Sequence, residues 1–231
     1  MFFDPMYLVM VLLPGLLISG IASLMVKSAF NRYSRVRSIR GMTGAQAAQV
    51  LLDQAGIDDV RIVPAHGFLS DHYNPLTKEL ALSEQVYSSN SVAAIGVATH
   101  EAGHAIQHAT NYFPLWARSA LVPMASIGSN LGLIVMAVGL FLSKMVVLVG
   151  AILFGAVLLF QLVTLPVEFN ASSRAKRLVV EAGIVYPEER AGIDAVLNAA
   201  AMTYVAAAVS TLLTLLYYLW RAGLLGGGRD E

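Results

Sequence analysis

Four runs of this chain contain no charged residue and are long enough to cross a lipid bilayer. They are residues 7–26, 119–142, 145–167 and 199–220, and a transmembrane helix needs about 20 apolar residues. Hydrophobic residues make up 57% of the 231 residues and charged residues 13%, which is too apolar for an ordinary soluble domain. The sequence therefore predicts a mainly α-helical, polytopic membrane protein with about four transmembrane helices, organised as one membrane-embedded domain over residues 1–231.

Lysine and arginine residues gather in the two polar segments between these runs, residues 27–118 and 168–198. The first segment holds eight of the fifteen and the second holds four, whereas only Lys144 lies between the second and third runs. Because cytoplasmic loops of membrane proteins carry an excess of Lys and Arg, we expect both polar segments on the cytoplasmic face of the cell membrane. The formal net charge is zero, so we expect no nucleic-acid partner.

The first polar segment predicts a small α+β part. Residues 43–56 have the pattern of a capped helix, from Thr43 to Gly56. Residues 60–63, 68–73 and 79–82 have the composition of short strands, and we expect them to form a small antiparallel sheet. A second helix is expected from about residue 89 or 90 to residue 110.

This second helix contains the motif His100-Glu101-Ala102-Gly103-His104. Residues four apart share one face of a helix, so both imidazoles can point at one metal ion, and Zn²⁺ suits them. The chain has no cysteine, so thiolates cannot hold zinc. Glu101, one residue away, can accept a proton from a zinc-bound water. The alternative is that both histidines are hydrogen-bonded core residues, but three buried polar side chains without a shared partner would each cost about 1–3 kcal/mol.

A catalytic zinc site needs a third protein ligand, and two residues compete for this position. His108 follows His104 by four residues, but a straight helix carries it about 6 Å farther along the axis, so we expect a structural role for it. Glu168 directly follows the third apolar run, on the same side of the membrane as His100 and His104. Its carboxylate either reaches toward the membrane surface or completes a two-His, one-Glu zinc set.

Other polar residues are expected to lie outside the site. Glu181, Glu188 and Glu189 belong to a polar stretch with helix and turn signals, which is typical of solvated surface. The histidines at 66 and 72 are expected in solvated loops, and a role at the site stays open for both.

Three stretches together resemble a known family: ATHEAGHAIQH at 98–108, YNP at 73–75 and LPVEFNAS at 165–172. They are similar to the bacterial YugP-type neutral zinc metallopeptidases and, more remotely, to HtpX-type membrane proteases and CAAX prenyl proteases. The resemblance implies that Glu168 completes the zinc site with His100 and His104. In the remoter relatives an Asp four residues after this Glu orients a zinc-bound histidine. Ser172 stands there in this chain, so Ser172 or Asn170 would take over that role.

Together these features predict a membrane-integrated, zinc-dependent endopeptidase with a zincin-like catalytic part at the cytoplasmic membrane face. Glu101 would be its general base, Zn²⁺ its cofactor, and peptides or proteins its substrates, including membrane-associated ones. Arg174 follows on the same helix as Glu168, either near the substrate or as a membrane-flanking charge. The alternative function is a non-catalytic, zinc-stabilised membrane scaffold, adaptor or quality-control partner. Glu101 argues against it, because a purely structural site has no need of a base.

Overall fold

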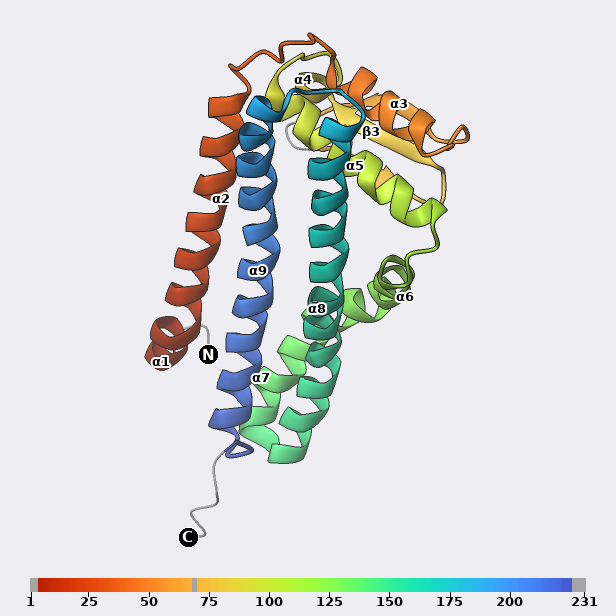
Figure 1. Ribbon diagram of the computed structural model, residues 1–231. Helices are drawn as coiled ribbons and strands as arrows, with labels where there is room; N and C mark the ends of the chain where they lie inside the picture. The colour runs from red at the N-terminus through yellow and green to blue at the C-terminus, as the bar shows by residue number, and fades with distance from the viewer. Residues whose placement is uncertain (1–3, 68–69, 226–231) are drawn as a thin grey trace. The chain divides into compact units, whose positions relative to one another are not determined.

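The computed structural model describes residues 4–67 and 70–225 of the chain (Figure 1). Its contacts divide the chain into two compact units. The first unit consists of Met1–Ala22, Ala117–Leu165 and Thr203–Glu231, and the second of Ser23–Trp116 and Pro166–Met202. The helices are α1 (Pro5–Tyr7), η1 (Leu8–Leu12), α2 (Leu13–Tyr33), α3 (Gly44–Gln54), α4 (Glu84–Tyr87), α5 (Val92–Ala109), α6 (Phe113–Ile127), η2 (Gly128–Gly132), α7 (Leu133–Leu142), α8 (Lys144–Glu181), η3 (Pro187–Glu189) and α9 (Arg190–Arg221).

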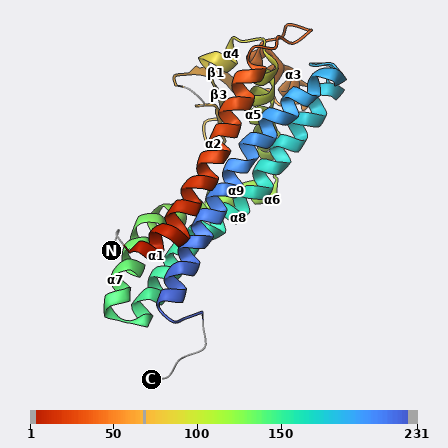
Figure 2. The same ribbon diagram turned by 90° about the vertical axis from the view of Figure 1, so that its left-hand side faces the viewer.

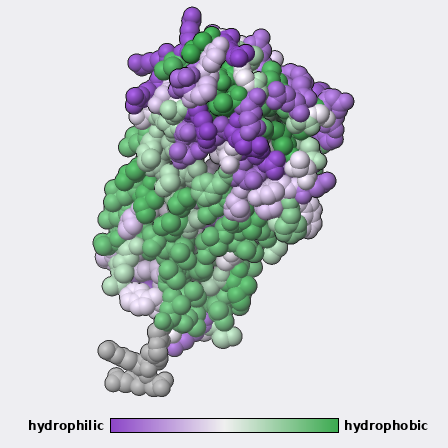
Figure 3. Space-filling view, in the orientation of Figure 1, coloured by the Kyte–Doolittle hydropathy of each residue, from purple (hydrophilic) through white to green (hydrophobic). Residues whose placement is uncertain are grey.

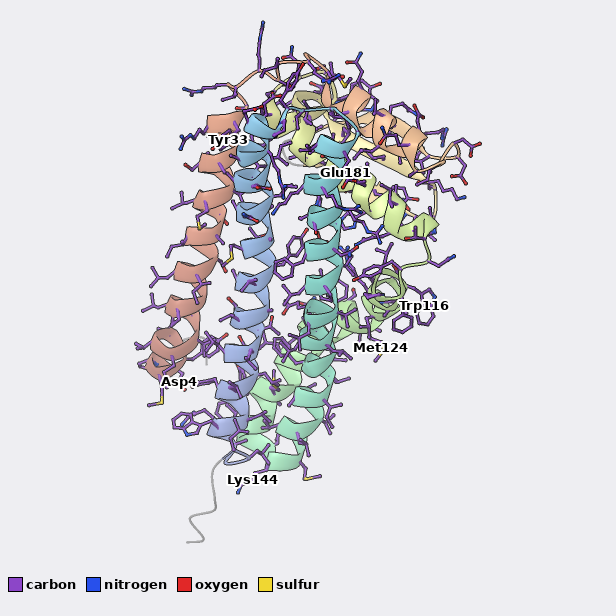
Figure 4. The ribbon with its side chains drawn as sticks, viewed as in Figure 1. Asp4, Tyr33, Trp116, Met124, Lys144 and Glu181 are labelled. Atoms are coloured by element: carbon purple, nitrogen blue, oxygen red, sulfur yellow. The ribbon has the colours of Figure 1, made fainter. Side chains whose placement is uncertain are left out.

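Four helical stretches of the described chain are long and apolar enough to cross a membrane. They are Pro5–Tyr33, Phe113–Leu142, Lys144–Glu181 and Pro187–Arg221, and each contains one of the predicted apolar runs. Figure 4 marks where two of these stretches end, at Tyr33 and at Glu181. The prediction of a mainly helical chain with about four membrane-spanning helices is thus confirmed.

In the first unit, α7 and α8 form a hairpin around one extended residue, Ser143. Two glycines allow the hairpin to close. A Cβ atom on Gly132 would lie 2.6 Å from the main-chain nitrogen of Phe154, and one on Gly128 would collide with the carbonyl oxygen of Leu153. Small residues four apart, such as Gly128 and Gly132, allow membrane helices to pack closely. Here they bring their helical stretch against α8.

Charged and aromatic residues link the start of α1 to the last turns of α9 within this unit. The hydroxyl of Tyr217 donates to Asp4 Oδ2 at 2.5 Å, and Arg221 lies 3.4 Å from the same oxygen. In Figure 2, α2 and α9 lie side by side, with Gly15 next to Ser210 in this unit. These contacts hold the first and last membrane helices together.

Large apolar side chains cover the outside of the first unit. Phe141 is 78% exposed and Ile152 is 68% exposed, and Figure 3 shows a largely hydrophobic surface over these helices. Monomeric soluble proteins rarely expose continuous apolar patches of this extent. Contact with lipid explains it, because hydrocarbon replaces water around the side chains.

The second unit is built around α5, most of whose residues are buried. Helix α3 packs against it, and α3 begins with the expected cap: the Thr43 hydroxyl accepts from the Gln46 amide, and the Gln46 side chain accepts from the Thr43 amide. The apolar core of this unit draws on α3, the sheet, α5 and α9, with Leu51, Leu52, Leu80, Leu82, Ile95, Ile193 and Leu197 among its fully or almost fully buried residues.

The sheet of the second unit has the strand order β1-β3-β2, with β1 at Arg61–Ala65, β2 at His72–Asn74 and β3 at Glu79–Ser83. The hairpin of β2 and β3 is antiparallel, but β1 pairs with β3 in parallel. The prediction of an antiparallel sheet was therefore wrong for β1. Strand β3 is the most buried of the three, so it takes the central position, and β1 adds to its remaining edge. The predicted strand at 68–73 begins only at His72, and its residues 68 and 69 lie outside the described residues.

The start of α3 gives a test of this packing. A Cβ atom on Gly44 would collide with the carbonyl oxygen of Val86 and lie 3.1 Å from that of Ala94. Both neighbours are main-chain atoms, so Gly44→Ala forces α3 away from α4 and α5, and we expect a loss of about 1–3 kcal/mol in stability. Thermal unfolding in detergent, followed by circular dichroism, measures it. Gly20→Ala adds the same methyl group with nothing within 4 Å, and equal midpoints for the two variants would contradict the prediction.

Candidate metal centre

Helix α5 presents the two histidines of the motif on one face. The helix begins at Val92, two to three residues later than predicted, and the hydroxyl of Ser91 caps it by accepting a hydrogen bond from the Ala94 amide at 3.2 Å. His100 is partly buried and His104 is 8% exposed. Their ring centroids lie 4.8 Å apart, as expected for residues one helical turn apart.

Glu168 of α8 meets both rings from the opposite side. Its Oε2 lies 3.2 Å from Nε2 of His100 and 3.4 Å from Nε2 of His104, and the residue is only 2% exposed. All three residues belong to the second unit. Among the described residues, these three form the group of histidines and carboxylates able to hold one metal ion, with ligand atoms within 4.8 Å of one another.

The spacing of these atoms fits a zinc ion. Zinc binds nitrogen and carboxylate oxygen at about 2.0–2.2 Å in tetrahedral geometry, so two of its ligand atoms lie about 3.3 Å apart. The distances of 3.2 and 3.4 Å match this value. They are longer than the about 2.7–2.9 Å of an ordinary hydrogen bond between a cationic N–H and a carboxylate. The donor set and the spacing of its atoms thus suit Zn²⁺.

Electrostatics favour a cation at this place. Burial by itself lowers the pKa of His104, but the hydrogen bond to Glu168 and the negative charges of Glu101 and Glu168 outweigh burial, so the pKa is raised above its ordinary value. The negative charges that favour a proton on His104 also attract a metal cation.

Glu101 adds a second buried carboxylate beside the histidines. It is 8% exposed and follows His100 directly on α5, and its charge acts on the His104 ring. It is not a member of the group of potential ligands found among residues 4–67 and 70–225. Glu101 therefore lies beside the possible ligand group without belonging to it.

Each histidine has a partner for its second ring nitrogen. Nδ1 of His100 lies 3.2 Å from the hydroxyl of Ser172, and Nδ1 of His104 lies 2.9 Å from Oε1 of Gln107. Such partners orient metal-binding histidines. From the sequence we expected Ser172 or Asn170 in this role, and Gln107 was not predicted. A signal was available, since a glutamine three residues after His104 in a buried helix needs hydrogen-bond partners.

A glycine in the motif brings the two helices together. A Cβ atom on Gly103 would lie 2.8 Å from the carbonyl oxygen of Ala171 and 3.3 Å from its carbonyl carbon and Cα. Helices α5 and α8 therefore touch main chain to main chain beside the histidines. This contact sets how far Glu168 reaches across to the rings.

The remaining histidines lie elsewhere. His66 is highly exposed and lies 3.4 Å from Glu84, and His72 contacts the carbonyl oxygen of Ser70 at 2.8 Å. Nδ1 of His108 lies 2.8 Å from the hydroxyl of Tyr73. His108 thus faces the sheet, on the border of a cavity of about 360 Å³ that is also lined by Gly56, Ile57, Asp58, Asp59, Val60, Tyr73, Lys78, Ala105 and Ala109.

Several polar residues after Glu168 pair with groups outside the set of possible metal ligands. Glu181 pairs with Arg177 on the surface of α8. The carboxylate of Glu189 accepts hydrogen bonds from the main-chain amides of Ile39 and Tyr186, and Glu188 is exposed. Arg174 donates from Nε to Asn170 Oδ1 at 2.8 Å.

A membrane protein with two histidines and a glutamate gathered in this way has the features of a zinc metallopeptidase. Comparison with known families agrees: residues 8–223 match the family described as "Putative neutral zinc metallopeptidase", and the chain belongs to this family. It is similar to "Putative membrane protease YugP" of Bacillus subtilis (strain 168), with 44% identity over 211 residues, which are 91% of this chain and 92% of that protein. No solved structure matches the chain.

The contact at Gly103 predicts how a small change would alter metal binding. Gly103→Ala must push α5 from α8, because the added methyl group meets main-chain atoms. We expect zinc affinity to fall at least about tenfold, as for other losses of support around a metal site. Competition with a chromogenic chelator measures it. Gly96→Ala is the matched control on the same helix, since its Cβ would make an ordinary 3.4 Å contact with Ile193. Equal affinities would contradict the prediction.

Proposed function

We propose that this membrane protein is a zinc-dependent endopeptidase that hydrolyses peptide bonds with an activated water molecule. The observation that carries the proposal is the convergence of Nε2 of His100, Nε2 of His104 and Oε2 of Glu168 within ligand distance of one ion. Membership of the zinc metallopeptidase family supports it. The similarity to a protein named as a membrane protease supports peptides or proteins, including membrane-associated ones, as substrates.

In the proposed mechanism His100, His104 and Glu168 hold the metal, and Glu101 handles the protons. Zinc, when bound, would polarise the scissile carbonyl and lower the pKa of a water molecule toward about 7. Three protein ligands are the number typical of catalytic zinc sites, whereas structural sites use four. Glu101 takes a proton from the attacking water and passes it to the leaving amine. Its burial keeps bulk water from competing for that proton.

We further propose that the chain is a single catalytic domain that crosses the cell membrane several times, with its active site at the cytoplasmic face. The excess of Lys and Arg in residues 27–118 and 168–198 supports this orientation. A zincin-like arrangement is supported by the packing of α5 against β2 and β3 in the second unit.

The role of Glu101 gives a direct test. Glu101→Gln keeps the size of the side chain but removes its ability to accept a proton. We expect zinc content to stay at the wild-type level and cleavage of a casein-derived fluorogenic substrate in detergent to fall about 10²–10⁴-fold. Glu188→Gln, on an exposed residue, is the control.

A wild-type rate for Glu101→Gln would show that another group is the base. A wild-type protein that holds zinc but cleaves none of a broad panel of peptides would instead favour the non-catalytic scaffold.

The role of Glu168 is tested by metal binding rather than by activity. Glu168→Gln removes the negative charge that the two imidazoles face, so we expect zinc affinity to fall by more than about 100-fold. Loss of a residue that only orients a metal ligand lowers metal affinity by about 10–100-fold, so a larger loss indicates a ligand. Chelator competition and the zinc-dependent rise in unfolding temperature measure it. Glu181→Gln, near the end of the same helix, should bind zinc like the wild type. Unchanged affinity in Glu168→Gln would remove Glu168 from the ligand set.

A further inference from the structure

Gln107 lies one turn after His104 on α5, and its exposed fraction is 0%. Its amide group has three partners. Oε1 lies 2.9 Å from Nδ1 of His104, and Nε2 donates to the carbonyl oxygen of Val167 at 2.8 Å and to Oδ1 of Asn170 at 3.0 Å. A buried amide with these partners is held in one orientation, because turning it over would place its oxygen against the two acceptor oxygens of Val167 and Asn170 and break both hydrogen bonds.

The direction of each hydrogen bond follows from those neighbouring groups that can only donate or can only accept. The main-chain carbonyl of Val167 can only accept. Arg174 can only donate, and its Nε lies 2.8 Å from Asn170 Oδ1, so that Oδ1 is also an acceptor. The Gln107 amide nitrogen therefore faces two acceptors and donates to both. Its oxygen is left to accept from His104, which places the proton on Nδ1 of that ring.

We propose that Gln107 is a positioning residue that selects the Nδ1–H tautomer of His104 and holds the ring in place for the metal. With the proton on Nδ1, the lone pair is on Nε2, the atom that lies 3.4 Å from Oε2 of Glu168. The inference rests on the proposed function in taking the metal as zinc. Val167 and Asn170, which hold Gln107, lie within one turn of Glu168 on α8, so the same helix segment supplies one ligand and orients another.

His100 has a different kind of partner. The hydroxyl of Ser172, 3.2 Å from Nδ1, can either donate or accept, so it does not select a tautomer. The two histidines of the motif are thus supported unequally, His104 by a directional amide and His100 by a hydroxyl. Ser172→Ala is therefore a matched control for a change at Gln107.

The competing explanation is that Gln107 only ties α5 to α8. Both explanations predict that its loss weakens packing, but only positioning predicts a change in where the His104 proton lies. Gln107→Met keeps a similar volume and removes the acceptor. Gln107→Glu keeps an oxygen that accepts from His104 in either charge state of the carboxyl group, so it should restore the tautomer that Gln107→Met loses.

The proton is located by long-range ¹H–¹⁵N NMR of zinc-free, ¹⁵N-histidine-labelled protein in detergent. The pH is set above the pKa of His104, which lies above the ordinary histidine value of about 6.5, so that the ring is neutral and carries one proton. Wild type, Ser172→Ala and Gln107→Glu should show His104 protonated on Nδ1, and Gln107→Met should shift it toward Nε2–H. His104 protonated on Nε2 in the wild type would overturn the proposal. This result needs no variant, so the proposal stays testable if Gln107→Met fails to fold.

Zinc affinity, measured by chelator competition, separates the two proposals. We expect Gln107→Met to bind zinc about 10–100-fold more weakly than the wild type, and Ser172→Ala to lose less. Suppose that the wild type binds zinc, and that Gln107→Met binds it with equal affinity and keeps the same His104 tautomer. This outcome would overturn the positioning role of Gln107 and leave the proposed function standing. A wild type that binds no zinc would overturn the proposed function, and the positioning role with it.

Discussion

A carboxylate buried in a long apolar helix requires a positive partner, and the rest of the centre is arranged around this requirement. Glu168 is 2% exposed, and an ionised group without compensation would be costly there. The imidazoles of His100 and His104 supply the compensation, together with a proton or a metal ion. Because both rings meet the same carboxylate oxygen at distances typical of two zinc ligands, a metal ion fills this role better than a direct hydrogen bond does.

This arrangement depends on main-chain contact between α5 and α8. Gly103 lies against Ala171, so the two helices approach too closely for a side chain to separate them. At this distance the side chains of one helix reach the main chain of the other, as Gln107 does at Val167. Close packing and polar pairing therefore reinforce each other, because the first brings the partners within reach and the second satisfies the groups that packing has buried.

Much of this could be predicted from the residues because it follows from local periodicity. An i, i+4 pair on a helix puts His100 and His104 on one face whatever surrounds them. The apolar runs are long enough to cross the hydrocarbon core of a bilayer as helices, so predicting these helices needed no tertiary information. The nearness of Glu168 followed from topology, since a hairpin of two membrane helices returns the chain to the side from which it came. The distance between His104 and His108 along the helix axis likewise kept His108 away from the other two rings.

The sequence by itself determined the helices, the apolar runs and the spacing of the histidine motif, because each depends on residues a few positions apart. Only the tertiary structure decided which edge of β3 receives β1, that Ser172 contacts His100, and that Val167 and Asn170 hold the Gln107 side chain beside His104. These outcomes depend on segments separated by many residues, such as the 60 residues between Gln107 and Val167. Their pairing is settled by how the whole core packs, and no local pattern records it.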